Sequence, residues 1–162
     1  MERRIGIGAL AGLIAGVVFT VVALFLKTTM PDGEQTSMLV VAAETVHAHG
    51  WLAGWIASLV YTVVIGAIFG WLAATKTPSE SQSMVFGALY GVAWWIVSGL
   101  IVIPALLERV PLSSQAVDAM RPLALASLVE HLLYGVILGL VFPLLVTYLD
   151  RRHGAQAHHH AA

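Results

Sequence analysis

The sequence predicts an all-α membrane protein with four transmembrane helices, because the chain is strongly hydrophobic and its few charges are confined to short intervals. Of the 162 residues, 59% are hydrophobic and 10% are Asp, Glu, Lys or Arg, whereas about a quarter of the residues in a soluble domain are charged. The net charge of −1 argues against a nucleic-acid partner. The lipid bilayer is therefore the first expected partner.

Long charge-free intervals indicate the helices. No Asp, Glu, Lys or Arg occurs from Ile5 to Leu26, from Gly50 to Thr75 or from Ser81 to Leu107. A fourth apolar interval, Pro122 to Leu149, contains the single acid Glu130. Each interval exceeds the roughly 20 residues that cross a bilayer as a helix, and backbone groups must be paired in lipid. We expect one membrane domain over 1–162, with spans at about 5–27, 51–74, 84–107 and 125–148 and a short cytoplasmic tail at 150–162.

The basic residues predict the orientation, because Lys and Arg in short loops favour the cytoplasmic side. Five of the eight fall on the side of the two termini, which predicts a multi-pass protein of the cytoplasmic (inner) membrane with both termini in the cytoplasm. The five are Arg3, Arg4, Lys76, Arg151 and Arg152, and the three on the opposite side are Lys27, Arg109 and Arg121.

Two sequence patterns recur, which suggests an internal repeat. GALAG at 8–12 recurs as GALYG at 87–91. SLV at 58–60 recurs at 127–129, and each copy is followed by two glycines at the same spacing. The repeat predicts two tandem helical hairpins with the same membrane orientation, related by an axis along the membrane normal. The alternative is a chance match among the common residues Gly, Ala, Leu and Val.

Glycines four residues apart occur in every expected span. Helices gain no hydrophobic energy by associating in lipid, so small residues favour packing by allowing close van der Waals contact. These GxxxG faces predict a compact bundle, a homo-oligomer or a subunit of a larger membrane complex. The packing glycines are Gly8, Gly12, Gly16, Gly66, Gly70, Gly87, Gly91, Gly135 and Gly139.

Five polar residues are expected near one side of the membrane. Glu44, His47 and His49 precede the second span, and Glu130 and His131 lie in the fourth. Imidazole binds transition metals and haem iron, and carboxylates complete such sites. The five residues therefore form a candidate metal or haem site. In the alternative, the imidazoles are interfacial or bonded to backbone carbonyls, since the ligand motifs HxxxH and HExxH are both missing.

Glu130 also has an interpretation of its own. An ionisable group within a span is costly and points to a functional role, such as proton, ion or solute transport. His131 follows it directly, but adjacent positions on a helix point about 100° apart. The alternative is a shallow carboxylate that reaches the headgroups.

Catalytic templates are missing from the sequence. The chain has no cysteine, no G-x-S-x-G, no P-loop and no dinucleotide-binding fingerprint, so we expect no catalytic residues and no enzyme activity. His158, His159 and His160 form either a metal-binding tract or part of a disordered tail.

The second half of the chain carries GALYG at 87–91, Pro104, Pro111 and SLVEHL at 127–132. In these residues it resembles YagU-like proteins, small prokaryotic inner-membrane proteins without an agreed biochemical activity. The resemblance implies a bacterial or archaeal cytoplasmic membrane protein.

Three functions follow from these patterns. The first is a non-catalytic accessory or scaffold subunit of a membrane assembly. The second is a metal- or haem-binding protein that uses the histidines at the outer ends of its second and fourth helices. The third is a small proton, ion or solute transporter that uses Glu130.

Overall fold

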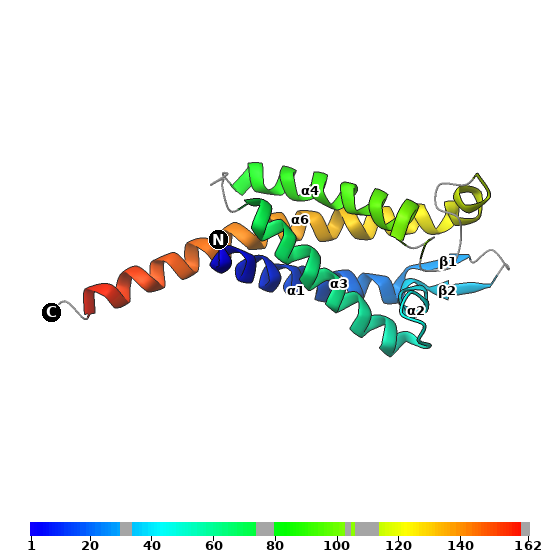
Figure 1. Cartoon of the computed structure of the whole chain (residues 1–162), viewed down its shortest axis with the longest axis horizontal. Helices are drawn as coiled ribbons and strands as arrows, with labels where there is room; N and C mark the ends of the chain where they lie inside the picture. Colours follow the sequence, from blue (N-terminus) through cyan, green and yellow to red (C-terminus); the bar gives the residue numbers. More distant parts are fainter. Residues whose placement is uncertain (30–33, 74–79, 103–104, 106–113, 160–162) are drawn as a thin grey trace.

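The computed structural model describes residues 1–29, 34–73, 80–102, 105 and 114–159 (Figure 1). Its described part is mainly helical, with one small two-stranded sheet. The elements in chain order are α1 (Glu2–Phe25), β1 (Lys27–Thr29), β2 (Gln35–Ser37), α2 (Met38–Glu44), α3 (Trp51–Leu72), α4 (Glu80–Val97), the π-helix η2 (Ser98–Val102) and α6 (Ser114–His159).

The prediction of four transmembrane helices is wrong, although the helical class agrees with the sequence. Within the described residues, three helices are long and apolar enough to cross a membrane: Glu2–Phe25, Trp51–Leu72 and Ser127–Arg152. These three helices mark the chain as a membrane protein. The helix α4 falls short because its first turn is the polar run 80–83 and because regular α-helix ends after 18 residues, where η2 begins. The two predicted hairpins are therefore not both pairs of spans.

The segment between α1 and α3 contains both β-structure and a short helix. Lys27 pairs with Ser37 in an antiparallel ladder between β1 and β2, and α2 follows directly. Leu39 of α2 is fully buried beside Ala23 of α1. The hairpin and α2 thus form a compact cap at the end of the bundle away from the N-terminus (Figure 1).

The long helices are arranged as two pairs. The helix α1 packs along α3, α4 packs along α6, and α1 also packs against α6, so that these two helices join the pairs. α1 and α4 run in one direction, and α3 and α6 run in the other (Figure 1). Phe69 of α3 is buried near the meeting point, where its ring contacts Phe86, Tyr90 and Phe142.

Glycines occupy the closest contacts within both pairs. A Cβ added at Gly8 would lie 2.7 Å from the Cα of Gly70, and one at Gly87 would lie 2.8 Å from the Cα of Gly139. These distances are too short for any side chain, so the backbones touch. Gly12 and Gly66 are placed in the same way in the first pair, and Gly91 and Gly135 in the second, while Gly16 faces Thr62.

The helix α6 extends past the other helices toward the C-terminus (Figure 1). Where it leaves the bundle, Nη1 of Arg3 lies 2.6 Å from Oδ1 of Asp150. The expected short tail from residue 150 is therefore helical as far as His159, and His160 lies outside the described residues. Further residues used in the sequence predictions also lie outside them: Lys76, Pro104, Arg109 and Pro111.

Candidate functional site

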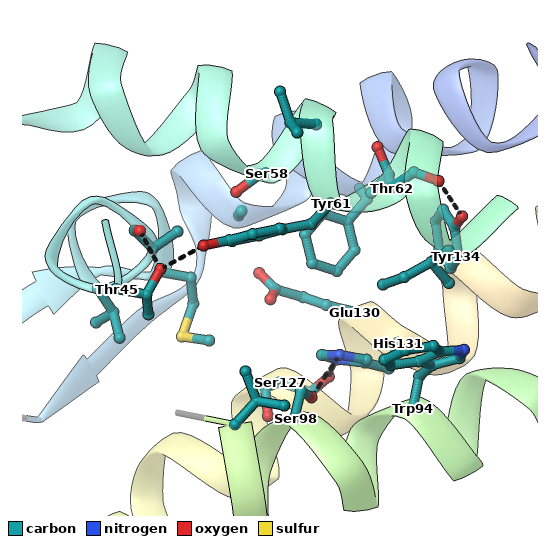
Figure 2. A pocket seen from close by; sticks show the side chains of 18 of the residues that line it. Thr45, Ser58, Tyr61, Thr62, Trp94, Ser98, Ser127, Glu130, His131 and Tyr134 are labelled. Carbon is teal, nitrogen blue, oxygen red and sulfur yellow. Dashed lines mark hydrogen bonds between the residues drawn. The ribbon is translucent and has the colours of Figure 1, made fainter. Parts of the chain in front are cut away.

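A cavity of about 440 Å³ lies between the two helix pairs, near the capped end of the bundle (Figure 2). All the long helices, α2 and η2 contribute to its wall. Its volume falls within the range of small-molecule sites, about 300–1,000 Å³. Most of the lining side chains are apolar, including Ala23, Met38, Val41, Val60 and Val64.

Glu130 is the acidic residue of this cavity. Its position on α6 places it on the same helix face as Ser127 and Tyr134, three residues before and four after, and all three line the cavity. Glu130 is 1% exposed, and its Oε1 has no hydrogen-bond partner. In Figure 2 the carboxyl group points into the space below Tyr61.

Burying an isolated carboxylate in such apolar surroundings costs free energy. Burying an ionised carboxyl without a partner costs far more than burying a paired one, so the group must either hold a proton or meet a positive charge. In the described lining, Lys and Arg do not occur, and the other ionisable side chains are Tyr61, His131 and Tyr134. The cavity can therefore accept one proton or one cation at Glu130.

The imidazole of His131 is held by two hydrogen bonds. Its Nδ1 lies 2.8 Å from the carbonyl oxygen of Ser127, and this nitrogen must donate because a carbonyl only accepts. Its Nε2 lies 3.0 Å from Oγ of Ser98 on η2. The ring also meets the edge of Phe19, with 5.8 Å between centroids. Both ring nitrogens are thus engaged within the protein.

Tyrosine hydroxyls complete the polar groups around the cavity. The hydroxyl of Tyr134 donates to the carbonyl oxygen of Thr62 at 2.7 Å, which ties α6 to α3. The hydroxyl of Tyr61 lies 3.1 Å from Oγ1 of Thr45. Thr45 uses its own proton on the carbonyl oxygen of Ala42, so Tyr61 is the donor between them. Unlike Glu130, both phenols are satisfied.

The five predicted metal ligands do not come together. Glu44 ends α2, while His47 and His49 are exposed in the turn that follows, where His47 has a φ of 55°. None of these three lines the cavity, whereas Glu130 and His131 do. Among the residues that the structure describes, no group of three His, Cys, Asp or Glu side chains is placed to hold a metal ion. The described residues thus do not assemble the predicted five-residue site.

The sequence reasoning missed several residues of the cavity, among them Thr45, Tyr61 and Ser98. One signal was available for Tyr61, because the repeat SLV at 58–60 and 127–129 aligns Tyr61 with Glu130. The structure brings these two equivalent positions to the same cavity (Figure 2). Ser98 had no comparable signal, since its role depends on the placement of η2 against α6.

Comparison with known proteins gives one match. The model of a family of unknown function, DUF6789, matches residues 2–153, and the chain belongs to this family. No curated protein and no solved structure matches the chain. The resemblance of the second half to YagU-like proteins stays a prediction.

Proposed function

We propose that this DUF6789 protein is a small solute carrier of the membrane, with its binding site in the cavity between the two helix pairs. One observation supports the proposal above all: Oε1 of Glu130 is buried, lacks a partner and faces a cavity of about 440 Å³. The proposal corresponds to the third function considered from the sequence.

A purely structural carboxyl group would be expected to have partners. Buried polar groups are nearly always hydrogen-bonded, and an exception calls for an explanation such as a ligand. The only other buried side-chain oxygen without a partner in the described residues is Oγ of Ser83, which does not line the cavity. A neutral hydroxyl is cheaper to bury than a carboxylate, so Glu130 is the stronger indication of a ligand.

The scaffold hypothesis stays a prediction. The glycine faces do not by themselves call for a partner, because Gly8, Gly66, Gly87 and Gly135 lie against backbone atoms of this same chain. Assembly into a homo-oligomer or a larger complex stays a prediction. The absence of enzyme activity also stays one.

We further propose that the protein lies in a prokaryotic cytoplasmic membrane with both termini in the cytoplasm. Four basic residues support this orientation, since they lie at the start of α1 and at the end of the apolar part of α6, and such clusters favour the cytoplasmic side. They are Arg3, Arg4, Arg151 and Arg152.

Labelling with dicyclohexylcarbodiimide tests the site. This lipid-soluble reagent couples to protonated carboxyl groups in apolar surroundings, so we expect one adduct, on Glu130, by intact mass and peptide mapping. The variant Glu130→Gln should give no adduct, and Glu44→Gln should be labelled like the wild type. Neopentylbenzene, a neutral apolar probe, should slow the labelling by filling the cavity.

Matched cavity variants sharpen the same test. Val60 lines the cavity and is 55% exposed, whereas Val85 on α4 is 62% exposed and does not line it. Val60→Trp should slow the labelling of Glu130, and Val85→Trp should not. A wild-type protein that is never labelled, or that no small probe protects, would contradict a solute-binding cavity.

A further inference from the structure

Building on the proposed carrier function, we propose that the solute is a hydrophobic organic cation, such as a protonated or quaternary amine, which replaces the proton on Glu130. The exchange balances in charge: the carboxylic acid and the free cation give a carboxylate–cation pair and one released proton. Three features of the cavity support this class of ligand.

The first feature is the charge of the lining. Phe19 and Ala23 from α1, and the lining residues of α2, α4 and η2, contribute no titratable group. The remaining titratable groups are Tyr61 from α3 and His131 and Tyr134 from α6, whose polar atoms bond to Thr45, Ser98, Ser127 and Thr62. Glu130 is left as the sole acid of the described lining, so a single positive charge neutralises the cavity.

The second feature is the apolar and aromatic wall. The aromatic residues Phe19, Tyr61, Trp94 and Tyr134 line the same cavity as Glu130. Aromatic faces attract organic cations, and an apolar body gains free energy by leaving water. An inorganic ion that has lost its water would instead require several oxygen ligands, and the described lining offers one carboxyl group in a mostly apolar wall. The wall therefore favours an organic cation.

The third feature is the way into the cavity. At one end, α3 and α4 are in contact, because the rings of Phe69 and Phe86 meet at a tilt with centroids 5.4 Å apart and the Tyr90 hydroxyl donates to the carbonyl oxygen of Ile65. Toward the capped end, Val60 of α3 and Val102 of η2 both line the cavity and remain exposed. In the described part of the chain, the cavity thus opens on the apolar outer surface of the helices. A cation dissolved in the bilayer can reach Glu130 by this route.

Two probes of the same shape, one charged and one neutral, measure the effect of charge on affinity. Benzyltrimethylammonium and neopentylbenzene differ in one central atom, N⁺ against carbon. Each is added at equal concentration in the detergent phase to the purified full chain, and its affinity is read from the protection of Glu130 against the carbodiimide. We expect the cation to bind roughly tenfold or more tightly than the neutral probe, because a charge-assisted contact replaces an unpaired group.

Proton release provides a second, independent readout. Titration calorimetry with the cation, in two weakly acidic buffers of different ionisation enthalpy, should show about one proton released per bound cation. In Glu130→Gln, the calorimetric affinity for the cation should fall by the same factor and the release should vanish. Glu130→Asp should keep the proton release. Val60→Trp should slow association of the cation, and Val85→Trp should leave it unchanged.

The outcomes separate the two proposals. Equal protection by the cation and the neutral probe would overturn the assignment of the ligand class and leave the solute-binding function standing. Protection by neither probe would overturn both. Cation binding without proton release, or undiminished in Glu130→Gln, would also overturn the exchange at Glu130.

Discussion

Glycine contacts join the two helices within the α1/α3 pair and also within the α4/α6 pair, but the side chains beside these contacts differ. In the first pair, a Cβ at Gly66 would lie 2.6 Å from the Cα of Gly12, and in the second, one at Gly135 would lie 3.0 Å from the Cα of Gly91. The residues that precede these glycines are Tyr61 and Thr62 in one pair and Glu130 and His131 in the other. The two pairs thus share their glycine contacts, but only the α4/α6 pair has an acidic residue beside them.

A second difference between the pairs lies one turn beyond these glycines. The helix α1 continues its close approach at Gly16, which faces Thr62 of α3. The repeat places the bulky Trp95 of α4 at the equivalent position, where its Nε1 donates to the carbonyl oxygen of Ala124 at 2.8 Å. Regular α-helix ends two residues later and η2 begins. One pair keeps a third small residue, and the other has a large side chain at that position.

The largest expected effect comes from the contacts that the pairs share. Gly66→Leu and Gly135→Leu should each lower the free energy of unfolding by ~3 kcal/mol or more, because the added side chain meets backbone atoms that cannot move aside. Detergent–denaturant titration followed by circular dichroism measures this. Gly6→Ala is the control, since nothing lies within 4 Å of the added Cβ. Tolerance of one leucine and not the other would show that the pairs are not equivalent.

A smaller effect is expected from the hydroxyls that join the pairs. Tyr134→Phe and Tyr90→Phe each remove a bond to a carbonyl oxygen of α3, at Thr62 and Ile65. Each change should lower the free energy of unfolding by about 1 kcal/mol. The same titration measures it, and Tyr148→Phe on the exposed end of α6 should change stability little. An unchanged stability in both buried variants would contradict these bonds.

Removing the carboxyl group of Glu130, the acid present only in the second pair, should not lower the free energy of unfolding. Glu130→Gln should leave the stability unchanged or raise it by roughly 0.5–1 kcal/mol, because it removes a carboxyl group that has no partner. Tyr61→Phe, at the equivalent position, should lower the stability because it loses the bond to Thr45. Thermal unfolding in detergent distinguishes them. A clear loss of stability in Glu130→Gln would indicate that this carboxyl group has a structural role.

The smallest effect is expected at the ion pair that links α1 to the end of α6. The side chains of Arg3 and Asp150 are 48% and 54% exposed, so solvent screens their attraction. Arg3→Ala should cost less than about 0.5 kcal/mol, and the cost should disappear at high salt. Arg151→Ala, exposed near the same end, is the matched control. A salt-independent loss would show that Arg3 acts through packing rather than charge.

The sequence predicted three spans well because the lipid bilayer constrains amino-acid composition strongly. The expected helices at about 5–27 and 51–74 correspond to Glu2–Phe25 and Trp51–Leu72. The expected span at 84–107 was wrong, because a charge-free interval does not reveal the change from α-helix to π-helix at Ser98. The expected span at 125–148 corresponds to the candidate span Ser127–Arg152, although the helix α6 itself is longer.

Only the residue whose burial in a membrane helix is energetically costly could be predicted from the sequence. Glu130 stood out because a charge is rare in an apolar helix, and it lines the cavity. Thr45 and Ser98 gave no such signal, because their roles depend on contacts between elements distant in sequence. His47 and His49 have the chemistry of metal ligands, but they do not lie in the cavity with Glu130 and His131. The sequence shows the chemistry of these residues and not their positions in space.

The two hydroxyl bonds to α3 also bear on how that helix can move. Tyr134 and Tyr90 hold carbonyl oxygens at Thr62 and Ile65, about one helical turn apart, from two different helices. They fix the middle of α3 to the second helix pair. On the capped side of these bonds α2 packs against α3, and on the other side the glycine contacts with α1 hold it. The helix α3 is therefore anchored along its length, which favours a cavity that is already formed before a ligand binds.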